Sequence, residues 1–210
     1  MVEARRRLET GGRAAVGWRQ LAAHVGVSPA SLYTYFSNLD DLFAELILQS
    51  YRSLGDAIEA TLQDLASSPA ADRALAGPLA YRQWALANRG QFNLIFTDLI
   101  AGYEAPPDGA STEAEIAVFR PMAAALAEAL GEEPAEPIDS GASVERFIGL
   151  WGTFHGLTSL EVNHHLDWID RERVYETQVR WHLEQLGVSP ASDLSDRLRR
   201  LGTTRPGTAT

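Results

Sequence analysis

Residues 17–36, GWRQLAAHVGVSPASLYTYF, contain two short helical patterns separated by a tight turn. One side of the first pattern is apolar and is formed by Trp18, Leu21, Ala22 and Val25. Gly26 follows where a left-handed helix end is favoured, Ser28 can cap the next helix, and Pro29 suits its first position. Two helices joined so closely predict a helix-turn-helix.

The second pattern has an anchoring side and a free side. Leu32 and Phe36 lie one turn apart and are expected to hold this helix on its domain. The free side suits a major groove, because a small apolar side chain can touch a thymine methyl and hydroxyls can reach base edges or phosphates. A chance pattern in a small three-helix domain is the alternative, but cap, turn and proline all agree. The residues expected at DNA are Arg19, Ser28, Ala30, Ser31, Tyr33, Thr34 and Tyr35.

At these residues the chain resembles the TetR family of one-component transcriptional regulators. The resemblance rests on Gly26-Val27-Ser28, on Leu32-Tyr33 with Tyr35-Phe36, and on a following helix entered through acidic residues and Leu42. It implies an all-α protein, with a three-helix DNA-binding head at residues 1–39 and a helical bundle for ligand binding and dimerisation at residues 40–188. The family often has a lysine just before the acidic residues, where this chain has Leu39, so a phosphate contact is missing. DNA affinity is then expected to depend more on Arg19, the tyrosines and the N-terminus of the next helix.

Composition and charge are compatible with this architecture. The chain has 210 residues and no cysteine, and no apolar run approaches the ~20 residues of a membrane span. No signal peptide is visible, so a cytoplasmic location is expected. The net charge is −10, yet residues 1–39 hold five arginines against two glutamates, a balance of +3 that leaves −13 for the remainder. Only one end of the molecule would therefore approach DNA, in a fixed orientation.

Helical patterns continue along the rest of the chain, with breaks at proline and glycine. Gly77-Pro78, Gly102–Gly109 and Gly131–Gly141 are expected to interrupt them. Residues 189–210 are expected to form a disordered polar tail with only a weak helix around residues 194–201. Helices are expected over residues 1–10, 40–66, 81–88, 91–100, 113–130, 144–168 and 170–186.

The expected helix 144–168 has two unlike faces that both look buried. Phe147, Trp151, Phe154, Thr158 and Val162 form the first. Glycines dominate the second, and each costs about 1 kcal/mol relative to alanine inside a helix, so close helix packing must compensate. In the next helix Val174 and Trp181 point away from the apolar stripe and need another surface. A dimer interface is favoured over an intramolecular core, and its expected residues are Gly149, Gly152, Gly156, Leu160, Val174 and Trp181.

An effector pocket is expected where large aromatic side chains converge in the bundle. Residues 151–157, with Leu160-Glu161, also resemble the Trp-His-Gly motif of a ligand-binding C-terminal subgroup of the same family. A bundle lined by rings favours a flat or lipophilic ligand, although an ordinary aromatic core is the alternative. Binding would release DNA if it favoured a tilted helix 40–66. The expected lining is Tyr81, Trp84, Phe92, Phe96, Phe119, Phe147, Trp151, Phe154 and His155.

Enzyme chemistry finds little support in the sequence. Glu161-x-x-His164, near His155 and His165, has a di-iron spacing, but the second copy that such a site needs was not found. Neither a nucleophile elbow nor a glycine-rich phosphate loop is present, so no catalytic residue, metal or cofactor is expected. We therefore expect a ligand-responsive repressor that binds a palindromic operator as a homodimer. The alternatives are a helical enzyme and a helix-turn-helix protein that has lost DNA binding and acts through protein partners.

Overall fold

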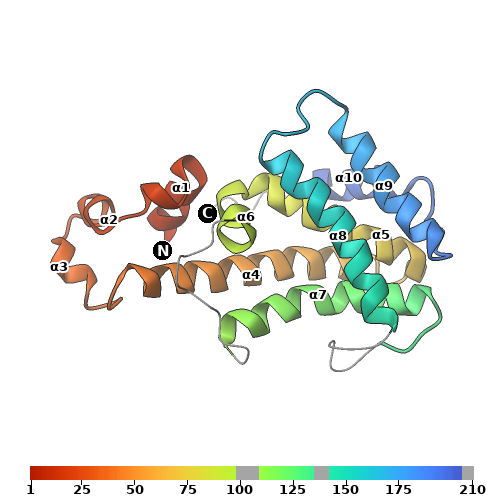
Figure 1. Ribbon diagram of the computed structural model, residues 1–210, viewed down its shortest axis with the longest axis horizontal. Helices are drawn as coiled ribbons and strands as arrows, with labels where there is room; N and C mark the ends of the chain where they lie inside the picture. Colours follow the sequence, from red (N-terminus) through yellow and green to blue (C-terminus); the bar gives the residue numbers. More distant parts are fainter. Residues whose placement is uncertain (98–108, 135–141, 205–210) are drawn as a thin grey trace.

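The computed structural model describes residues 1–97, 109–134 and 142–204, and all regular structure within these ranges is helical (Figure 1). The predicted all-α class is confirmed. In the described ranges no helix is long and apolar enough to cross a membrane. The elements are α1 (Val2–Gly11), the 3-10 turn η1 (Arg13–Ala15), α2 (Trp18–Val25), α3 (Pro29–Leu32), α4 (Leu39–Asp64), α5 (Ala70–Ala87), α6 (Arg89–Phe96), α7 (Ala110–Ala129), α8 (Ala142–Val162), α9 (Arg171–Gln185) and α10 (Leu194–Thr204).

The turn between α2 and α3 has the geometry predicted from its residues. Gly26 ends α2 in the left-handed region, with φ 75° and ψ 29°. Ser28 caps α3, because its hydroxyl oxygen accepts a hydrogen bond from the Ser31 backbone N–H at 3.3 Å, and Pro29 occupies the first turn. The helix-turn-helix prediction is therefore confirmed.

The second helix of the motif is shorter than its pattern suggests. α3 has four residues, and Tyr33 to Tyr35 continue as turns rather than as helix. Leu32 and Phe36 are partly buried and pack against the core, as expected of anchors. Trp18 of α2 contacts the Phe36 ring at a centroid distance of 6.4 Å.

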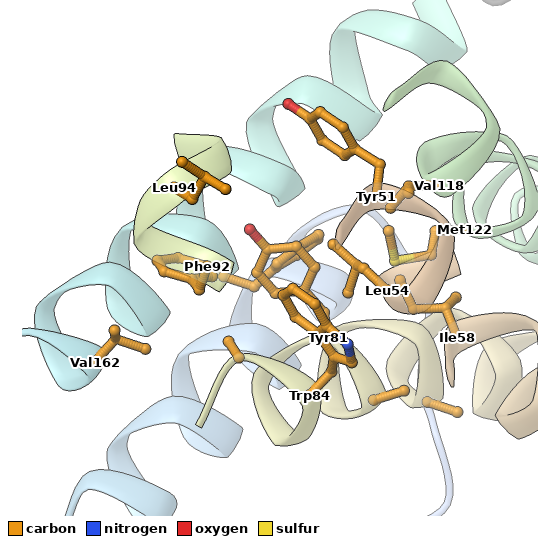
Figure 2. Packing of buried hydrophobic residues seen from close by; sticks show 14 of the residues in the cluster. Tyr51, Leu54, Ile58, Tyr81, Trp84, Phe92, Leu94, Val118, Met122 and Val162 are labelled. Atoms are coloured by element: carbon orange, nitrogen blue, oxygen red, sulfur yellow. The ribbon is translucent and has the colours of Figure 1, made fainter. Parts of the chain in front are cut away.

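α4 connects the head to the bundle as one helix of 26 residues. Asn38 caps it by accepting the Asp41 backbone N–H at 2.8 Å, and Asp40 and Asp41 lie in the first turn, where the helix dipole favours acids. In Figure 1 the helix runs from the head along α7. Its buried stripe, part of which is seen in Figure 2, comprises Leu42, Phe43, Leu46, Ile47, Ser50, Tyr51, Leu54 and Ile58.

The break expected at Gly77-Pro78 is wrong, because α5 continues through both residues. Proline inside a helix removes a hydrogen bond and costs about 3 kcal/mol, so neighbouring contacts must compensate. The Pro78 carbonyl accepts the Tyr175 hydroxyl at 2.7 Å. A Cβ at Gly77 would lie 2.7 Å from Cγ of Met122, so the absent side chain lets α7 pack closely.

The C-terminal region differs from its prediction in two places. α8 ends at Val162 rather than near Trp168, because His164 adopts a left-handed φ of 64°. The segment after residue 188 is packed rather than a disordered tail: Leu194 is fully buried, and the Asp72 carboxylate accepts the Ala191 N–H at 2.7 Å. Residues 205–210 of that expected tail, residues 102–108 and 135–141 of the two expected loops, and the end of the expected helix 91–100 from residue 98 onward lie outside the described residues.

Candidate DNA-binding and effector sites

The predicted DNA-contacting side chains form an exposed surface at the end of the head. Tyr33 is 54% exposed and Tyr35 is 79% exposed. The Tyr33 ring also contacts Trp18 at 5.4 Å, which supports it from one side. Ser28 and Ser31 share a hydroxyl hydrogen bond at 3.0 Å, so these two groups partly serve the helix cap. All seven are exposed: Arg19, Ser28, Ala30, Ser31, Tyr33, Thr34 and Tyr35.

The arginines of α1 are engaged within the head. Arg6 and Arg7 each place Nε 2.7 Å from a carboxylate oxygen of Glu3, and Arg5 donates to the Gln49 amide oxygen at 2.8 Å. The hydrogen bond from Arg6 lowers the pKa of Glu3 to about 2. α1 is thus held by ion pairs to its own Glu3 and by a hydrogen bond to Gln49 of α4, so these arginines serve the fold.

The structure brings together most of the predicted effector residues in one group of touching rings. The distances between ring centroids are 5.0 Å for Tyr81 and Phe154, 4.9 Å for Phe96 and His155, and 4.9 Å for Phe119 and Trp151. We call this group the aromatic cluster; it comprises Tyr81, Phe92, Phe96, Phe119, Phe147, Trp151, Phe154 and His155.

Trp84 is the predicted effector residue that lies beside this group rather than in it. It follows Tyr81 by one turn of α5 and is buried (Figure 2). Its indole N–H donates to the Ser53 hydroxyl of α4 at 3.1 Å. Trp84 therefore ties α5 to the connecting helix.

Burial divides the aromatic cluster into a core and an edge. Tyr81, Phe92, Phe147 and Phe154 are buried and belong to the hydrophobic core. The edge residues retain partial exposure and are the ones a ligand could touch without unfolding the bundle; they are Phe96, Phe119, Trp151 and His155.

Three polar groups meet at this edge. The Tyr81 hydroxyl lies 2.7 Å from Nδ1 of His155. Burial raises the pKa of Tyr81 and lowers that of His155, so both side chains are stabilised in their neutral forms. The indole Nε1 of Trp151 is buried and makes no hydrogen bond.

A joint between α1 and α6 connects the head to the aromatic cluster. The Glu9 carboxylate accepts the backbone N–H groups of Gly90 at 2.7 Å and Gln91 at 3.0 Å, which caps the N-terminus of α6. A Cβ at Gly90 would lie 2.4 Å from the carbonyl oxygen of Leu8, so only glycine permits this approach. The sequence alone does not predict this joint, because no local pattern links residues 81 positions apart.

The predicted dimer face of α8 is open in the protomer. A Cβ at Gly152 or Gly156 would meet no atom within 4 Å, whereas Gly149 faces His182 of α9. Leu160 is 42% exposed and Trp181 is 56% exposed, and Ile148, not predicted, is 50% exposed. Val174 is partly buried. Gly152 and Gly156 therefore do not serve close packing against another helix in the described part of the chain.

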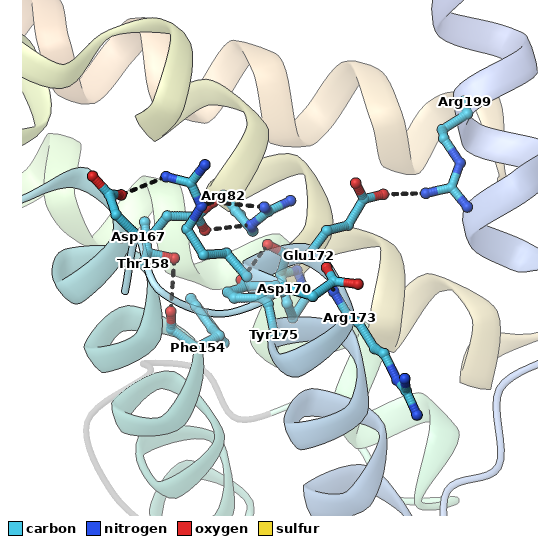
Figure 3. Close-up of polar contacts among 12 residues, drawn as sticks. Arg82, Phe154, Thr158, Asp167, Asp170, Glu172, Arg173, Tyr175 and Arg199 are labelled. Atoms are coloured by element: carbon cyan, nitrogen blue, oxygen red, sulfur yellow. Dashed lines mark hydrogen bonds and ion pairs between the residues drawn. The ribbon is translucent and has the colours of Figure 1, made fainter. Parts of the chain in front are cut away.

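Three of the side chains considered as metal ligands, His155, Glu161 and His164, have other partners. Arg82 donates to both carboxylate oxygens of buried Glu161, at 2.7 and 2.8 Å, in the network shown in Figure 3. His164 pairs with Asp167 at 3.0 Å. Among the residues that can be described, no three potential ligands are grouped to hold a metal ion.

Comparison with known proteins matches both parts of the chain. A family model described as "Bacterial regulatory proteins, tetR family" matches residues 1–46. A second model, "Tetracyclin repressor-like, C-terminal domain", matches residues 73–184. The HTH-type transcriptional regulators Rv1816 of Mycobacterium tuberculosis and Mb1846 of Mycobacterium bovis are each 28% identical over 180 residues, which cover 75% of this chain and 76% of theirs.

A solved structure supports the same fold. A protein of unknown function from Rhodococcus sp. RHA1 superposes with a TM-score of 0.72 and 26% identity, covering 90% of this chain and 92% of that one. The similarity spans the head and the bundle together.

Proposed function

We propose, since this chain belongs to the TetR family of transcriptional regulators, that it is a repressor whose homodimer leaves a palindromic operator when a small lipophilic or aromatic effector binds. As a member of this family the chain is a DNA-binding regulator and not an enzyme. The helical-enzyme alternative is therefore set aside.

The observation that carries the proposal is the open surface of the helix-turn-helix. Ala30, Tyr33 and Thr34 are exposed side by side while Leu32 and Phe36 anchor the motif. Hydroxyl and small apolar groups exposed on such a surface are suited to phosphates and base edges. The head carries +3 and the remainder −13, which supports approach to DNA by this end alone.

The dimer is proposed from the open face of α8 and α9. Gly152 and Gly156 allow a second helix to approach closely, and Leu160 and Trp181 offer apolar area that a partner would cover. Two heads related by a two-fold axis would read successive major grooves about 34 Å apart or a multiple of that distance. The operator would then be an imperfect palindrome.

Effector release is proposed to act through α6 and α4. α6 contributes Phe92 and Phe96 to the aromatic cluster and is capped by Glu9 of the head. α4 carries the head at its N-terminal end. A ligand that binds better to a displaced α6 would shift the population towards a head arrangement that no longer fits the operator.

A gel-shift titration against DNA flanking the protein's own coding region tests the proposal. Tyr33→Ala and Thr34→Ala should each weaken binding by about 1–3 kcal/mol if the side chains contact DNA directly. Ser67→Ala, which also removes a hydroxyl at an exposed site but lies between α4 and α5, is the control and should bind like wild type. Leu32→Ala should instead destabilise the head, because it removes an anchor.

The two variants also separate the remaining alternatives. If both Tyr33→Ala and Thr34→Ala stay folded and bind DNA unchanged, the assigned face is wrong. If the wild-type protein itself binds none of the flanking DNA, a protein that acts through protein partners becomes the better interpretation.

A further inference from the structure

The indole N–H of Trp151 is the polar group of the aromatic cluster that the fold leaves unused. Among the described residues, the buried side-chain atoms without a hydrogen-bond partner are Arg5 Nε, Arg7 Nε, Trp151 Nε1, Arg180 Nη2 and Ser195 Oγ. The three arginines reach Gln49, Glu3 and Glu176 with their guanidinium groups. Trp151 has a single polar side-chain atom, and that atom makes no hydrogen bond of acceptable geometry. A buried, unpaired donor carries a free-energy cost that a bound acceptor would remove.

The residues around Trp151 show where a ligand could reach its unpaired N–H group. Its ring contacts Phe119 at 4.9 Å and His155 at 5.4 Å, both of which belong to the partly exposed edge. The N–H lies near enough to the Tyr81 hydroxyl to stabilise its ionised form, yet the two make no hydrogen bond of acceptable geometry. The Tyr81 hydroxyl is paired with Nδ1 of His155, and the Trp151 donor lies beside the partly exposed rings of Phe119 and His155.

Charge at the same edge disfavours an anion. Burial is the main cause of the raised pKa of Tyr81, and the carboxylate of Glu115 raises it further by repelling negative charge. His155 is stabilised in its neutral form by burial. A carboxylate ligand would meet the same repulsion, whereas an uncharged ligand would not.

We propose that the effector is a flat, uncharged lipophile whose carbonyl or similar oxygen accepts a hydrogen bond from Trp151 Nε1 while its rings pack on Phe119 and Phe96. This inference rests on the proposed effector function and adds the chemical class of the ligand. Trp151 is the specificity-determining residue, because a hydrocarbon of the same shape fills the same apolar contacts but leaves the donor unpaired.

Four probes of similar size distinguish the ligand classes. Acetylnaphthalene carries the acceptor, ethylnaphthalene lacks it, naphthoate is an anion and naphthylmethylammonium is a cation. Dissociation constants measured by equilibrium dialysis should be about tenfold lower for acetylnaphthalene than for ethylnaphthalene, and naphthoate should bind weakest.

Trp151→Phe isolates the donor, because it keeps an aromatic ring and removes the N–H. The variant should bind acetylnaphthalene about tenfold more weakly than wild type and ethylnaphthalene about equally well. Trp168→Phe, the same change at a site 81% exposed, is the control and should alter neither constant. Should Trp151→Phe fail to fold, the wild-type preference between the ketone and the hydrocarbon still decides the question.

The outcomes separate the ligand class from the effector function. Equal affinity for the ketone and the hydrocarbon, or a ketone preference that survives Trp151→Phe, would overturn the inference. Tightest binding of the ammonium would overturn it in favour of a cation held near Glu115. If none of the four probes binds, the effector site itself fails, and the ligand class fails with it.

Discussion

Gly90→Ala is the substitution for which the structure predicts an outcome opposite to helix propensity. Gly90 lies at the start of α6 and its φ is not in the left-handed region. On propensity alone, alanine in a helix should stabilise by up to about 1 kcal/mol. However, the new methyl group would lie 2.4 Å from the Leu8 carbonyl oxygen and 2.8 Å from Cα of Glu9. Both are backbone atoms, so no side-chain rotation relieves the clash.

The size of the expected stability loss follows from the contacts that break when α1 and α6 move apart. Moving α1 away from α6 breaks the two hydrogen bonds from Gly90 and Gln91 to the Glu9 carboxylate, at 2.7 and 3.0 Å. Each bond to a charged acceptor contributes about 1.5–3 kcal/mol, and partial exposure lets water replace some of that. We expect a net loss of about 3 kcal/mol, which lowers the melting temperature by roughly 6–12 °C for a chain of this size.

Thermal unfolding followed by circular dichroism measures this loss. Gly55→Ala in α4 is the matched control, because its new Cβ would meet Val118 at an ordinary 3.6 Å, and it should be neutral or stabilising. Hydrogen exchange should locate the Gly90→Ala effect in α1 and α6. A melting temperature equal to or above that of wild type would refute the view that the head is joined to the bundle at this point.

Two further predictions concern assembly and acid stability. Gly152→Leu should leave the protomer folded, since no atom lies within 4 Å of the new Cβ, but should shift sedimentation from dimer towards monomer; a dimer of unchanged affinity would remove Gly152 from the interface. The pKa of Glu3 is lowered from 4.5 to about 2, chiefly by its hydrogen bond to Arg6, so the ionised carboxylate stabilises the head above pH 4.5 and this stabilisation is lost as the pH falls towards 2. Glu3→Gln should therefore flatten the decline of the melting temperature over that interval, and an unchanged decline would show that other groups cause it.

Short-range signals in the sequence were sufficient to predict the helix-turn-helix of the head. Gly26, Ser28 and Pro29 each act within a few residues, and the structure uses them as predicted. The faces of α8 were likewise predictable, because helical periodicity alone separates Phe147 and Phe154 from the glycines. The exposure of the glycine face in the protomer is compatible with the dimer that we propose.

Contacts between distant residues account for what the sequence did not predict. Pro78 lies inside α5, and its carbonyl accepts a hydrogen bond from Tyr175, which is 97 residues away. The segment after residue 188 is ordered by Asp72, which is 119 residues from Ala191. Helix propensity and breaker rules describe neighbours along the chain, so tertiary contacts of this kind override them without a visible pattern.

The uninterrupted course of α4 restricts how the length of this protein can vary. α4 is about 39 Å long, and one buried stripe runs along it from Leu42, next to the head, to Ile58 in the bundle. A single inserted residue between them would rotate one end by about 100° relative to the other and advance it by about 1.5 Å. The head would then present a different side to its own bundle, and the spacing and orientation of the two heads in the proposed dimer would change. Insertions and deletions are therefore tolerable in the connections between helices, whereas the residue count of α4 is fixed by geometry.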